Sequence, residues 1–440
     1  MFRLLKSWQS FPFYLGIASY PFYRVFGTAA IALSASLFYL FPIPSHPQPS
    51  GPFQISSVDD ELATNRPLFW NNEAERRKIY YKVYYPSEHV SDFAEKEPIV
   101  QYFENRMKFL CQLVKIPFFM LEYFKFGISN TFVNQPVLKN KQYPVVLVSH
   151  GLTGTFDSHL SLVQSIASHG YVVVVLDHIG CATVAYLPKS DLIYKYSAGL
   201  KNISLKDAFK KRQQHVQIRT QDLKDIINKL KLRNTDINDV LYGSLNLNSV
   251  HLLGHSLGGA TALELSLPCI KSAIVMDAWT FPLSTNTIVQ PALRHTLAIQ
   301  ASQWFYKGDD FGKNNDDDIY HYCRNIMYPT NVEKDDERDG MDRSIFEKLN
   351  NSKSNSESGY KAYLVRIPMG HTDPTDVKFM MNTKVLGPLG LYKALVTPLE
   401  LHQYFDRSIV TFLNAVVNES FVGVESDLTK LQGSELELFQ

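Results

Sequence analysis

Apolar runs alternate with segments of helical spacing through the middle of the chain. Two of these runs, at 143–149 and 171–176, are continuous and rich in valine, which is typical of parallel strands buried on both faces. The segment between them, 152–170, has helical spacing, so the stretch predicts a βαβ unit. Further strands are predicted at 77–88, 248–254, 272–279, 295–302 and 361–368. This order predicts an α/β fold with a mostly parallel central sheet flanked by helices.

Polar insertions interrupt the pattern of strands and helices. Residues 205–231 have the composition of a helix with a basic face; we expect a solvated face and keep binding of lipid headgroups as the alternative. An acid-rich stretch before the last strand, 308–359, predicts an exposed and partly disordered excursion. We therefore expect a main folded domain over 53–420, an N-terminal segment with a Pro-rich linker over 1–52, and a C-terminal tail over 421–440.

The N-terminal segment is basic and apolar. It contains Arg3, Lys6 and Arg24 but no acidic residue before Asp59, and residues 25–41 are uncharged and mostly apolar. This length reaches the short limit for a membrane-spanning helix, so the leading interpretation is a signal anchor. A cleaved signal, an organelle-targeting peptide and an apolar segment packed on the protein's own surface are the alternatives. We expect a membrane-associated protein, held at an endomembrane by this anchor, with a cytoplasmic location as the alternative.

A second apolar and aromatic stretch, 102–126, is interrupted by Pro117 and predicts a pair of helices. Packing in the core is the expected role of these helices. The alternative is a surface that dips residues 118–121 into lipid, since aromatic and aliphatic residues beside Lys125 suit an interfacial helix.

Composition narrows the classes of function. The chain has 44 Lys and Arg against 43 Asp and Glu, so no overall positive field would recruit nucleic acid. None of the 13 histidines belongs to an HExxH motif, and no Cys/His cluster has zinc spacing, so we expect neither a metal nor another cofactor. The cysteines are too few and too widely spaced for a disulfide framework, and we interpret them as buried or incidental thiols. They are Cys111, Cys181, Cys269 and Cys323.

The stretch "LLGHSLGGAT", residues 252–261, contains a candidate nucleophile. Ser256 lies between Gly254 and Gly258, after a predicted strand and before a predicted helix. A G-x-S-x-G sequence alone is weak evidence, but a strand, a sharp turn and a helix are the setting that a nucleophile elbow requires. Small residues on each side of the serine let the tight turn pack against its neighbours. We therefore interpret Ser256 as a nucleophile.

A serine nucleophile needs a base, and the base needs a carboxylate to orient it. In hydrolases with this elbow the chain order is Ser, then Asp or Glu, then His. His371 follows the last strand in a Gly- and Pro-containing loop and is preferred as the base, whereas His402 has a helical context and is interpreted as structural. Asp277, at the end of a predicted strand, is preferred as the acid. Asp309 and Asp310 remain alternatives, although their charged surroundings look solvated.

The negative charge on a carbonyl oxygen under attack also needs fixed donors. These are usually the N–H that follows the nucleophile and an N–H from the loop after an earlier strand. The sequence offers Leu257 and, in "SHGLTG", Leu152. A plain strand-to-helix turn is the alternative interpretation of the second segment.

These segments together resemble the platelet-activating factor acetylhydrolase family, the group VII, calcium-independent phospholipases A2. The elbow is shared with many lipases, whereas "DAWTFPL" after the next strand is far more specific. The resemblance covers roughly residues 44–416. It rests on "YPVVLVSHGL", "ASHGYVVVVLDH", "LLGHSLGGAT", "AIVMDAWTFPL" and "MGHTD".

The resemblance implies an α/β-hydrolase fold with Ser256 as nucleophile, Asp277 as acid and His371 as base. It assigns the oxyanion donors to Leu152 and Leu257. It also implies hydrolysis, without a metal, of the sn-2 ester of phospholipids whose acyl chains are short or oxidised. A phospholipid is therefore the expected substrate.

Some family members bind lipid surfaces through the apolar helix before the first core strand, which corresponds here to about Leu113–Phe126. A membrane or lipid surface is thus an expected partner of this stretch and of the N-terminal segment. Leu257 stands where animal members often have Phe, which implies a shifted acyl preference. The acid-rich insertion and the N-terminal apolar segment have no clear counterpart in the family, so the resemblance implies nothing about location.

Two other functions remain open. A carboxylesterase or neutral-lipid lipase would use the same triad, because the machinery of acyl transfer is shared and only the pocket differs. A catalytically silent binding protein could also have this fold, although a complete triad argues against it.

Overall fold

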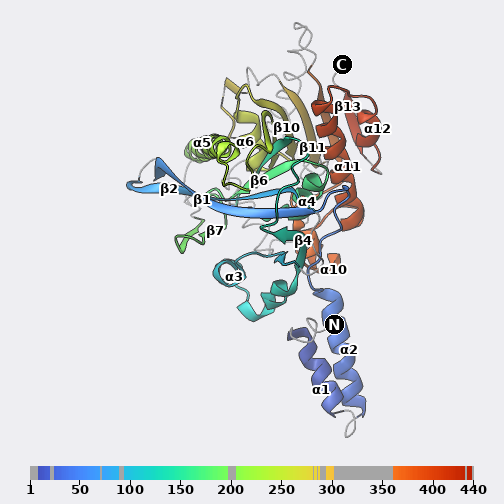
Figure 1. Ribbon diagram of the computed structural model, residues 1–440. Coiled ribbons are helices and arrows are strands. Elements are labelled where there is room, and N and C mark those ends of the chain that lie inside the picture. Colours follow the sequence, from blue (N-terminus) through green and yellow to red (C-terminus); the bar gives the residue numbers. More distant parts are fainter. Residues whose placement is uncertain are drawn as a thin grey trace.

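The computed structural model places a large mixed sheet at the centre of the protein (Figure 1). It describes residues 8–19, 24–69, 72–88, 94–196, 205–280, 282–284, 286–287, 294–301, 360–431 and 434–438. The acid-rich insertion at 308–359, with Asp309, Asp310 and Cys323, lies outside the described residues.

The sheet has eleven strands in the order β13-β12-β11-β10-β9-β5-β6-β2-β1-β4-β3. Its six central strands run parallel and confirm the mostly parallel sheet predicted from the sequence. They are β12 (Ala362–Ile367), β11 (His295–Ala301), β10 (Ile270–Met276), β9 (Leu245–His255), β5 (Tyr143–Ser149) and β6 (Val172–Leu176).

Antiparallel strands extend both edges of this parallel centre. On one side β2 (Asn72–Pro86) pairs with β6 and with β1 (Ile55–Phe69), and on the other side β13 (Glu435–Leu438) pairs with β12. The sheet ends at β4 (Ile128–Val133), which is parallel to β1, and at β3 (Lys96–Pro98). A separate ribbon joins β7 (Val184–Leu187) to β8 (Leu192–Lys195).

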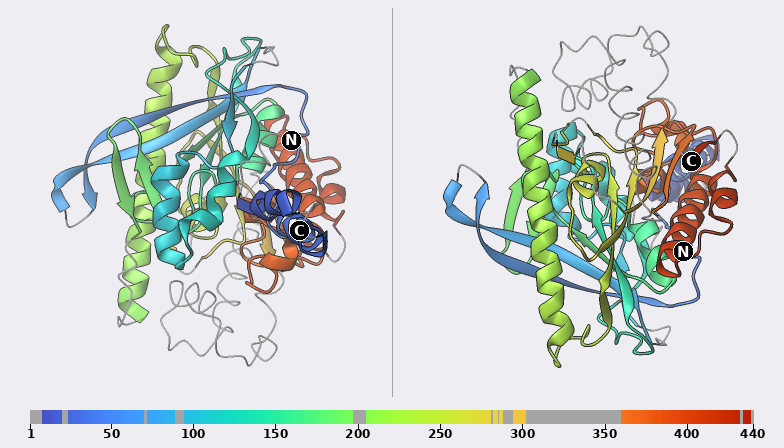
Figure 2. Two further views of the ribbon diagram at one scale, coloured as in Figure 1. Left: turned by 90° about the horizontal axis from the view of Figure 1, so that it is seen from below. Right: turned by 90° about the horizontal axis from the view of Figure 1, so that it is seen from above.

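Helices cover both faces of the sheet, as Figure 2 shows. α4 (Leu160–Ser168) and α11 (Pro398–Val417) pack on one face, and α5 (Leu205–Thr235) and α6 (Leu257–Glu264) pack on the other. β5 explains why two layers are needed. Val146 and Val148 belong to the core under α4 and α11, whereas Val145 and Leu147 belong to the core under α5 and α6. Because successive side chains of a strand point to opposite faces, a continuous apolar run is buried from both sides.

The C-terminal residues belong to the folded domain. α12 (Val424–Leu428) packs against α11, and Val424 and Leu428 are buried in the core. β13 then pairs with β12 as the edge of the sheet. The boundary predicted at residue 420, with a tail beyond it, is therefore too early. The sequence of this edge strand alternates strictly, but over only four residues, which is too short a run to stand out from the sequence.

The stretch 102–126 forms α3 (Phe103–Val114) and a 3-10 helix, η3 (Phe118–Phe126), in place of two α-helices. Pro117 lies between the two elements. Leu121 and Tyr123 are buried in a small cluster with α3, so Leu121 packs in the core rather than facing lipid. Phe119 is 56% exposed.

The N-terminal segment forms two helices joined as a hairpin, α1 (Phe11–Ser19) and α2 (Arg24–Leu40), after the short turn η2 (Trp8–Ser10). The hairpin projects from one end of the molecule (Figure 1). α2 covers most of the segment predicted as a signal anchor, residues 25–41. Within the part of the chain that the structure describes, no helix has the length and apolar character needed to span a bilayer.

A buried ion pair fastens α5 to the sheet. Arg77 of β2 donates to both carboxylate oxygens of Asp222 on α5, at 2.6 Å each, and Arg66 donates to the same carboxylate at 2.7 Å. Arg77 and Asp222 are both fully buried. Burial opposes ionisation of Asp222, but Arg77 and His178 beside it hold its pKa below the ordinary value.

We expect Arg77→Met to lower the free energy of unfolding by about 3 kcal/mol, because it leaves a buried carboxylate without its main partner. A lowered folded-state pKa contributes stability above the ordinary carboxyl pKa of about 4 and loses it as the pH falls further. The cost of the substitution should therefore be full at pH 7 and shrink below about pH 4. Chemical denaturation across this pH range measures it.

Lys430→Met is the matched control, because Lys430 pairs with Asp427 at the surface and is about half exposed. Its cost should stay within about 1 kcal/mol. Equal costs for the two variants would contradict a special role for the buried pair.

Candidate active site

Ser256 occupies the sharp turn between β9 and α6. Its backbone has φ 55° and ψ −120°, a conformation that side chains rarely adopt and that costs about 1–3 kcal/mol. The turn brings β9 and α6 into backbone contact. A Cβ atom on Gly254 would lie 2.1 Å from the carbonyl oxygen of Gly258, and one on Gly258 would lie 1.9 Å from that of Ser149. Only glycine fits at either position, as an elbow requires.

His371 and Asp277 meet at this turn. The Nε2 atom of His371 lies 2.9 Å from Oγ of Ser256, and its Nδ1 atom lies 2.5 Å from Oδ2 of Asp277. With an ionised carboxylate as the acceptor, Nδ1 of His371 keeps its proton and donates a hydrogen bond to Asp277, which leaves Nε2 as the acceptor for the serine hydroxyl. The structure thus brings together the three residues predicted as nucleophile, acid and base.

Three strands of the parallel centre supply these three residues: β9 and β10, which are neighbours, and β12, which β11 separates from β10. Asp277 follows β10 directly, with a positive φ of 43°, and its N–H donates to the carbonyl of Ile299 on β11 at 2.7 Å. Its second carboxylate oxygen accepts from the N–H of Ala301 at 3.1 Å. His371 lies in the loop after β12, and Ser256 follows β9. Since the carboxyl ends of parallel strands share one edge, the sheet assembles the cluster.

A second histidine, His255, holds the backbone of His371 in place. His255 is buried directly before Ser256, and its Nε2 atom lies 2.8 Å from the carbonyl oxygen of His371. Burial, with the nearby His371, keeps the pKa of His255 well below the ordinary value. The ring is therefore neutral at pH 7, with Nε2–H donating to this carbonyl. Asp373 closes the same loop by accepting from the N–H of Gly370 at 2.7 Å.

The loop after β5 lies against the elbow. A Cβ atom on Gly151 would be 3.3 Å from Cβ of Ser256 and 3.1 Å from Nδ1 of His255. Leu152 directly follows Gly151 and therefore lies close to the nucleophile. Leu257 is the first residue of α6, where N–H groups have no partner within the helix. Within the described ranges, neither leucine N–H donates a hydrogen bond to another group of the protein.

Arg219, fully buried on α5, holds this loop from behind. Its guanidinium donates to the carbonyl oxygens of His150 at 2.5 Å and Gly151 at 3.2 Å, directly before Leu152. Two charged donations to consecutive carbonyls fix the direction of the peptide that follows. Nothing in the sequence pairs α5 with this loop, so the arginine was not predicted.

Neutral histidines complete the support of the loop. Burial, with Arg219 nearby, lowers the pKa of His178 to about 4. Its Nδ1–H then donates to Asp222 at 2.9 Å, and its Nε2 lies 3.0 Å from the hydroxyl of Ser149. The backbone N–H of His178 donates to Nε2 of His150 at 3.2 Å. The ion pair that fastens α5 therefore also fixes residues 149–151.

Cys181 is part of this support. Burial opposes ionisation of its thiol, yet His215 and Arg219 beside it lower its pKa to about 6. Its carbonyl accepts from the N–H of Thr153 at 2.8 Å. The interpretation as an incidental buried thiol fits Cys111 but understates the contacts of Cys181.

His402 lies elsewhere, as the sequence indicated. It is buried in α11, with its ring near Phe379 and Nδ1 at 3.4 Å from the hydroxyl of Ser161. In the described ranges no group of three or more His, Cys, Asp or Glu side chains is close enough to hold a metal ion.

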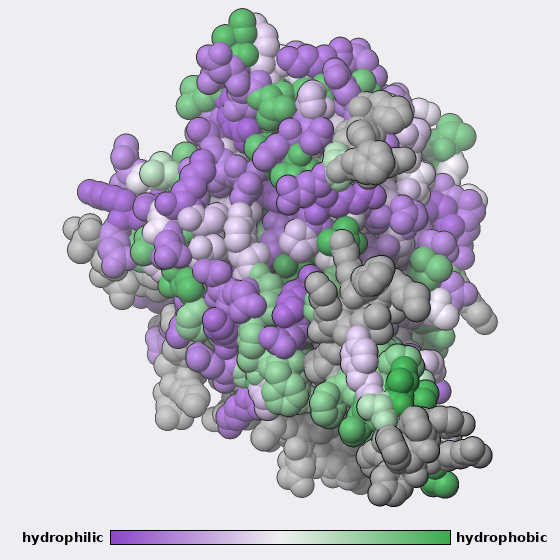
Figure 3. Space-filling view, turned by 60° about the horizontal axis from the view of Figure 1, so that its bottom comes forward, coloured by the Kyte–Doolittle hydropathy of each residue, from purple (hydrophilic) through white to green (hydrophobic). Residues whose placement is uncertain are grey.

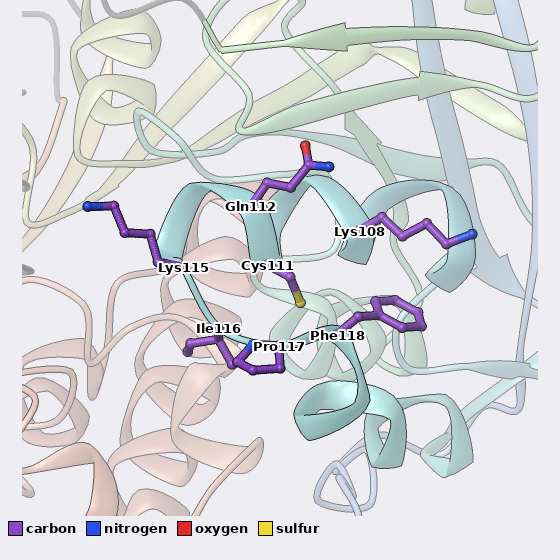
Figure 4. Close-up of a pocket in the computed structure, with 7 residues that line it drawn as sticks. All are labelled: Lys108, Cys111, Gln112, Lys115, Ile116, Pro117 and Phe118. Carbon is purple, nitrogen blue, oxygen red and sulfur yellow. The ribbon is translucent and has the colours of Figure 1, made fainter.

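A shallow pocket of about 400 Å³ opens on α3 and the turn after it (Figure 4). Two lysines extend away from it in opposite directions, and the rest of its lining is mostly apolar. None of the three clustered residues, Ser256, Asp277 and His371, lines it, so it is separate from the site. Its lining is Lys108, Cys111, Gln112, Lys115, Ile116, Pro117 and Phe118.

Proteins of known activity are similar in sequence to this chain. A platelet-activating factor acetylhydrolase from Cavia porcellus is 25% identical over 290 residues, which cover 61% of this chain and 62% of that protein. The protein of the same name from Canis lupus familiaris is 27% identical over 46% of this chain and 50% of its own length. Cutinase 1 from Thermobifida cellulosilytica is 25% identical over 35% of this chain and 47% of its own. The chain thus matches less than two thirds of the length of these relatives.

Solved structures share the fold. A ferulic acid esterase from Streptomyces cinnamoneus superposes with a TM-score of 0.61 over 84% of this chain and 92% of its own, at 16% sequence identity. This similarity confirms the α/β-hydrolase fold. The family described as platelet-activating factor acetylhydrolase, isoform II, matches residues 45–428. Since that match spans most of the chain, this protein belongs to the platelet-activating factor acetylhydrolase isoform II family.

Proposed function

We propose that this protein is a serine hydrolase that cleaves carboxylic esters through an acyl-enzyme. The observation that carries the proposal is the unbroken chain of hydrogen-bond distances from Oγ of Ser256 through His371 to Asp277. A serine hydroxyl becomes a useful nucleophile only when a neighbouring base accepts its proton. Here that base is oriented by a buried carboxylate.

The reaction begins when Oγ of Ser256 attacks the ester carbonyl while Nε2 of His371 takes its proton. Asp277 stabilises the imidazolium that forms. Nε2 then gives the proton to the leaving alcohol oxygen, and the acyl group stays on Ser256. A water molecule that loses its proton to Nε2 next attacks the acyl carbonyl, which releases the carboxylic acid and restores the serine hydroxyl.

The oxyanion of each tetrahedral intermediate would be held by the N–H groups of Leu152 and Leu257. Each donor is fixed before the reaction begins: Leu257 by the start of α6, and Leu152 by the loop that Arg219 anchors. Donors that need no rearrangement stabilise the transition state more than the ground state.

For the substrate we propose the sn-2 acyl ester of phospholipids with short or oxidised chains, cleaved without calcium. Family membership and the names of the mammalian relatives support this choice. The similarity to a cutinase supports a second candidate, a carboxylesterase of broader range with the same triad. The two candidates share all of the chemistry above and differ only in the pocket.

We expect Ser256→Ala and His371→Ala to lower kcat by at least about 10⁴-fold, since each removes a partner in the proton transfer. Asp277→Asn should lower kcat by about 10³- to 10⁴-fold, because the amide favours the wrong tautomer of His371. Turnover of a nitrophenyl ester measures these losses, with thermal unfolding as the check on folding. Asp309→Asn is the control and should keep full turnover; wild-type rates in Asp277→Asn would remove Asp277 from the mechanism.

A phosphatidylcholine series with sn-2 chains from acetyl to palmitoyl, assayed in excess EDTA, tests the substrate. We expect release of short and oxidised chains by the wild type and none by Ser256→Ala. Turnover of nitrophenyl esters without turnover of any phospholipid would favour the carboxylesterase. Loss of activity in EDTA that calcium restores would contradict the metal-free mechanism.

Arg219→Met tests the support of the oxyanion donor. It should lower kcat by about 10- to 100-fold with little change in KM, because a displaced donor weakens transition-state binding. Arg294→Met is a matched control. Arg294 is also buried and donates to the carbonyls of Ala262, Leu263 and Leu265, at the far end of α6. Both variants should lose stability, and equal losses of kcat would contradict a positioning role for Arg219.

A further inference from the structure

The hairpin α1–α2 carries apolar side chains on its outer surface. It projects from the body in Figure 1, and Figure 3 brings this end forward and shows hydrophobic side chains gathered there. Monomeric soluble proteins seldom expose so many large apolar groups on one small element. The exposed side chains include Phe11, Tyr14, Ile17, Val25, Leu33 and Tyr39, with exposed fractions from 47% to 87%.

The two helices pack through small residues. A Cβ atom on Gly16 would lie 2.7 Å from the carbonyl oxygen of Gly27 and 2.7 Å from a side-chain carbon of Ile31, so the helices touch at their backbones. Ser34 adds a buried hydrogen bond from its hydroxyl to the carbonyl of Gln9. Helix pairs inside lipid pack in this way, through small residues and hydrogen bonds, because lipid gives them no reason to hide large apolar side chains. The large apolar side chains here point outward.

The charge of this segment suits a phospholipid surface. The first acidic residue of the chain is Asp59, and α2 begins at Arg24, with Arg3 and Lys6 earlier in the sequence. Cations at the edge of an apolar segment are attracted to lipid phosphates. At the base of the hairpin, Nζ of Lys384 lies 5.4 Å from the ring centre of Tyr39. An aromatic ring beside a lysine is typical of the membrane interface.

The base of the hairpin is fastened to the segment that carries His371. The backbone N–H of Asn382 donates to the carbonyl of Leu40 at 3.1 Å, and its side chain donates to the carbonyl of Tyr39 at 3.2 Å. Asn382 comes shortly after His371, across η5 (Asp376–Phe379) and before α10 (Thr383–Leu386). Exposed Phe119 lies on η3, which contacts η2 at the start of the hairpin.

We propose that the hairpin α1–α2, with Phe119 beside it, docks the protein on a phospholipid bilayer. The outward apolar side chains enter the lipid, the small-residue seam holds the helices together there, and Lys384 beside Tyr39 meets the phosphates. Attachment through Asn382 keeps the loop of His371 next to the docked surface. The hairpin precedes residue 45, where the family match begins, so it adds an element of this chain to the shared fold. The inference that docking brings phospholipid to the triad rests on the proposed function. The inference that the hairpin docks on a bilayer does not depend on it.

Flotation of the full chain with phosphatidylcholine vesicles tests the proposal, with and without phosphatidylserine. The Ser256→Ala background keeps the vesicles intact during the measurement. We expect the parent chain to float with vesicles, more strongly when phosphatidylserine is present. Ile17→Asp with Leu33→Asp should lower the partition coefficient at least tenfold, since both side chains are about half exposed on the hairpin.

Ile237→Asp with Val422→Asp is the matched control, because both side chains are exposed away from the hairpin, at 74% and 93%. This pair should float like the parent. Turnover of a soluble nitrophenyl ester by each pair with Ser256 restored shows that the folded domain is intact.

Equal flotation of the hairpin pair and the parent would overturn the proposal. So would a parent chain that fails to float but sediments as a stable dimer that the hairpin substitutions dissociate, since a second copy would then cover the apolar surface. Normal flotation without hydrolysis of any phospholipid by the chain with Ser256 would leave docking in place and contradict the proposed substrate.

Discussion

The backbone turn at Ser256 is the constraint on which the rest of the site depends. Its positive φ is held only because β9 and α6 approach each other to backbone contact at Gly254 and Gly258. Gly258 also packs against the carbonyl of Ser149, the last residue of β5. One strained residue thus sets the position of the nucleophile, the start of α6 and the loop that contains Leu152. The packed parallel sheet supplies the rigidity that keeps this strain in place.

The site is polar, yet its support is almost entirely buried. Neutral His255 holds the backbone of His371, neutral His178 holds Ser149, and Arg219 holds the next two carbonyls. Burial keeps both supporting histidines uncharged, so each offers one donor and one acceptor in a fixed direction. A buried polar network of this kind is stabilising only when its members are paired. Asp222 on α5 accepts from both His178 and Arg77, so the same carboxylate pairs the network and fastens α5 to the sheet.

Much of the site could be predicted from the sequence because its signals are local. The apolar run before Ser256, the glycines around it and the positions of Asp277 and His371 after later strands are all visible in a linear reading. Arg219 and His178 were missed because their roles arise from contacts between distant segments. The long strand β1 was missed because its sequence alternates poorly and pairing with β2 stabilises it, whereas the edge strand β13 alternates but is only four residues long. The 3-10 geometry of η3 likewise reflects packing that composition does not encode.

The most direct test of the central claim is to find the residue that carries the covalent adduct. The protein is treated with a fluorophosphonate until ester turnover stops, digested, and sequenced by mass spectrometry. The account predicts one adduct per chain, on Ser256, formed far more slowly in His371→Ala. Full inactivation with the adduct on another residue, or normal labelling of Ser256 in His371→Ala, would contradict the proposed triad.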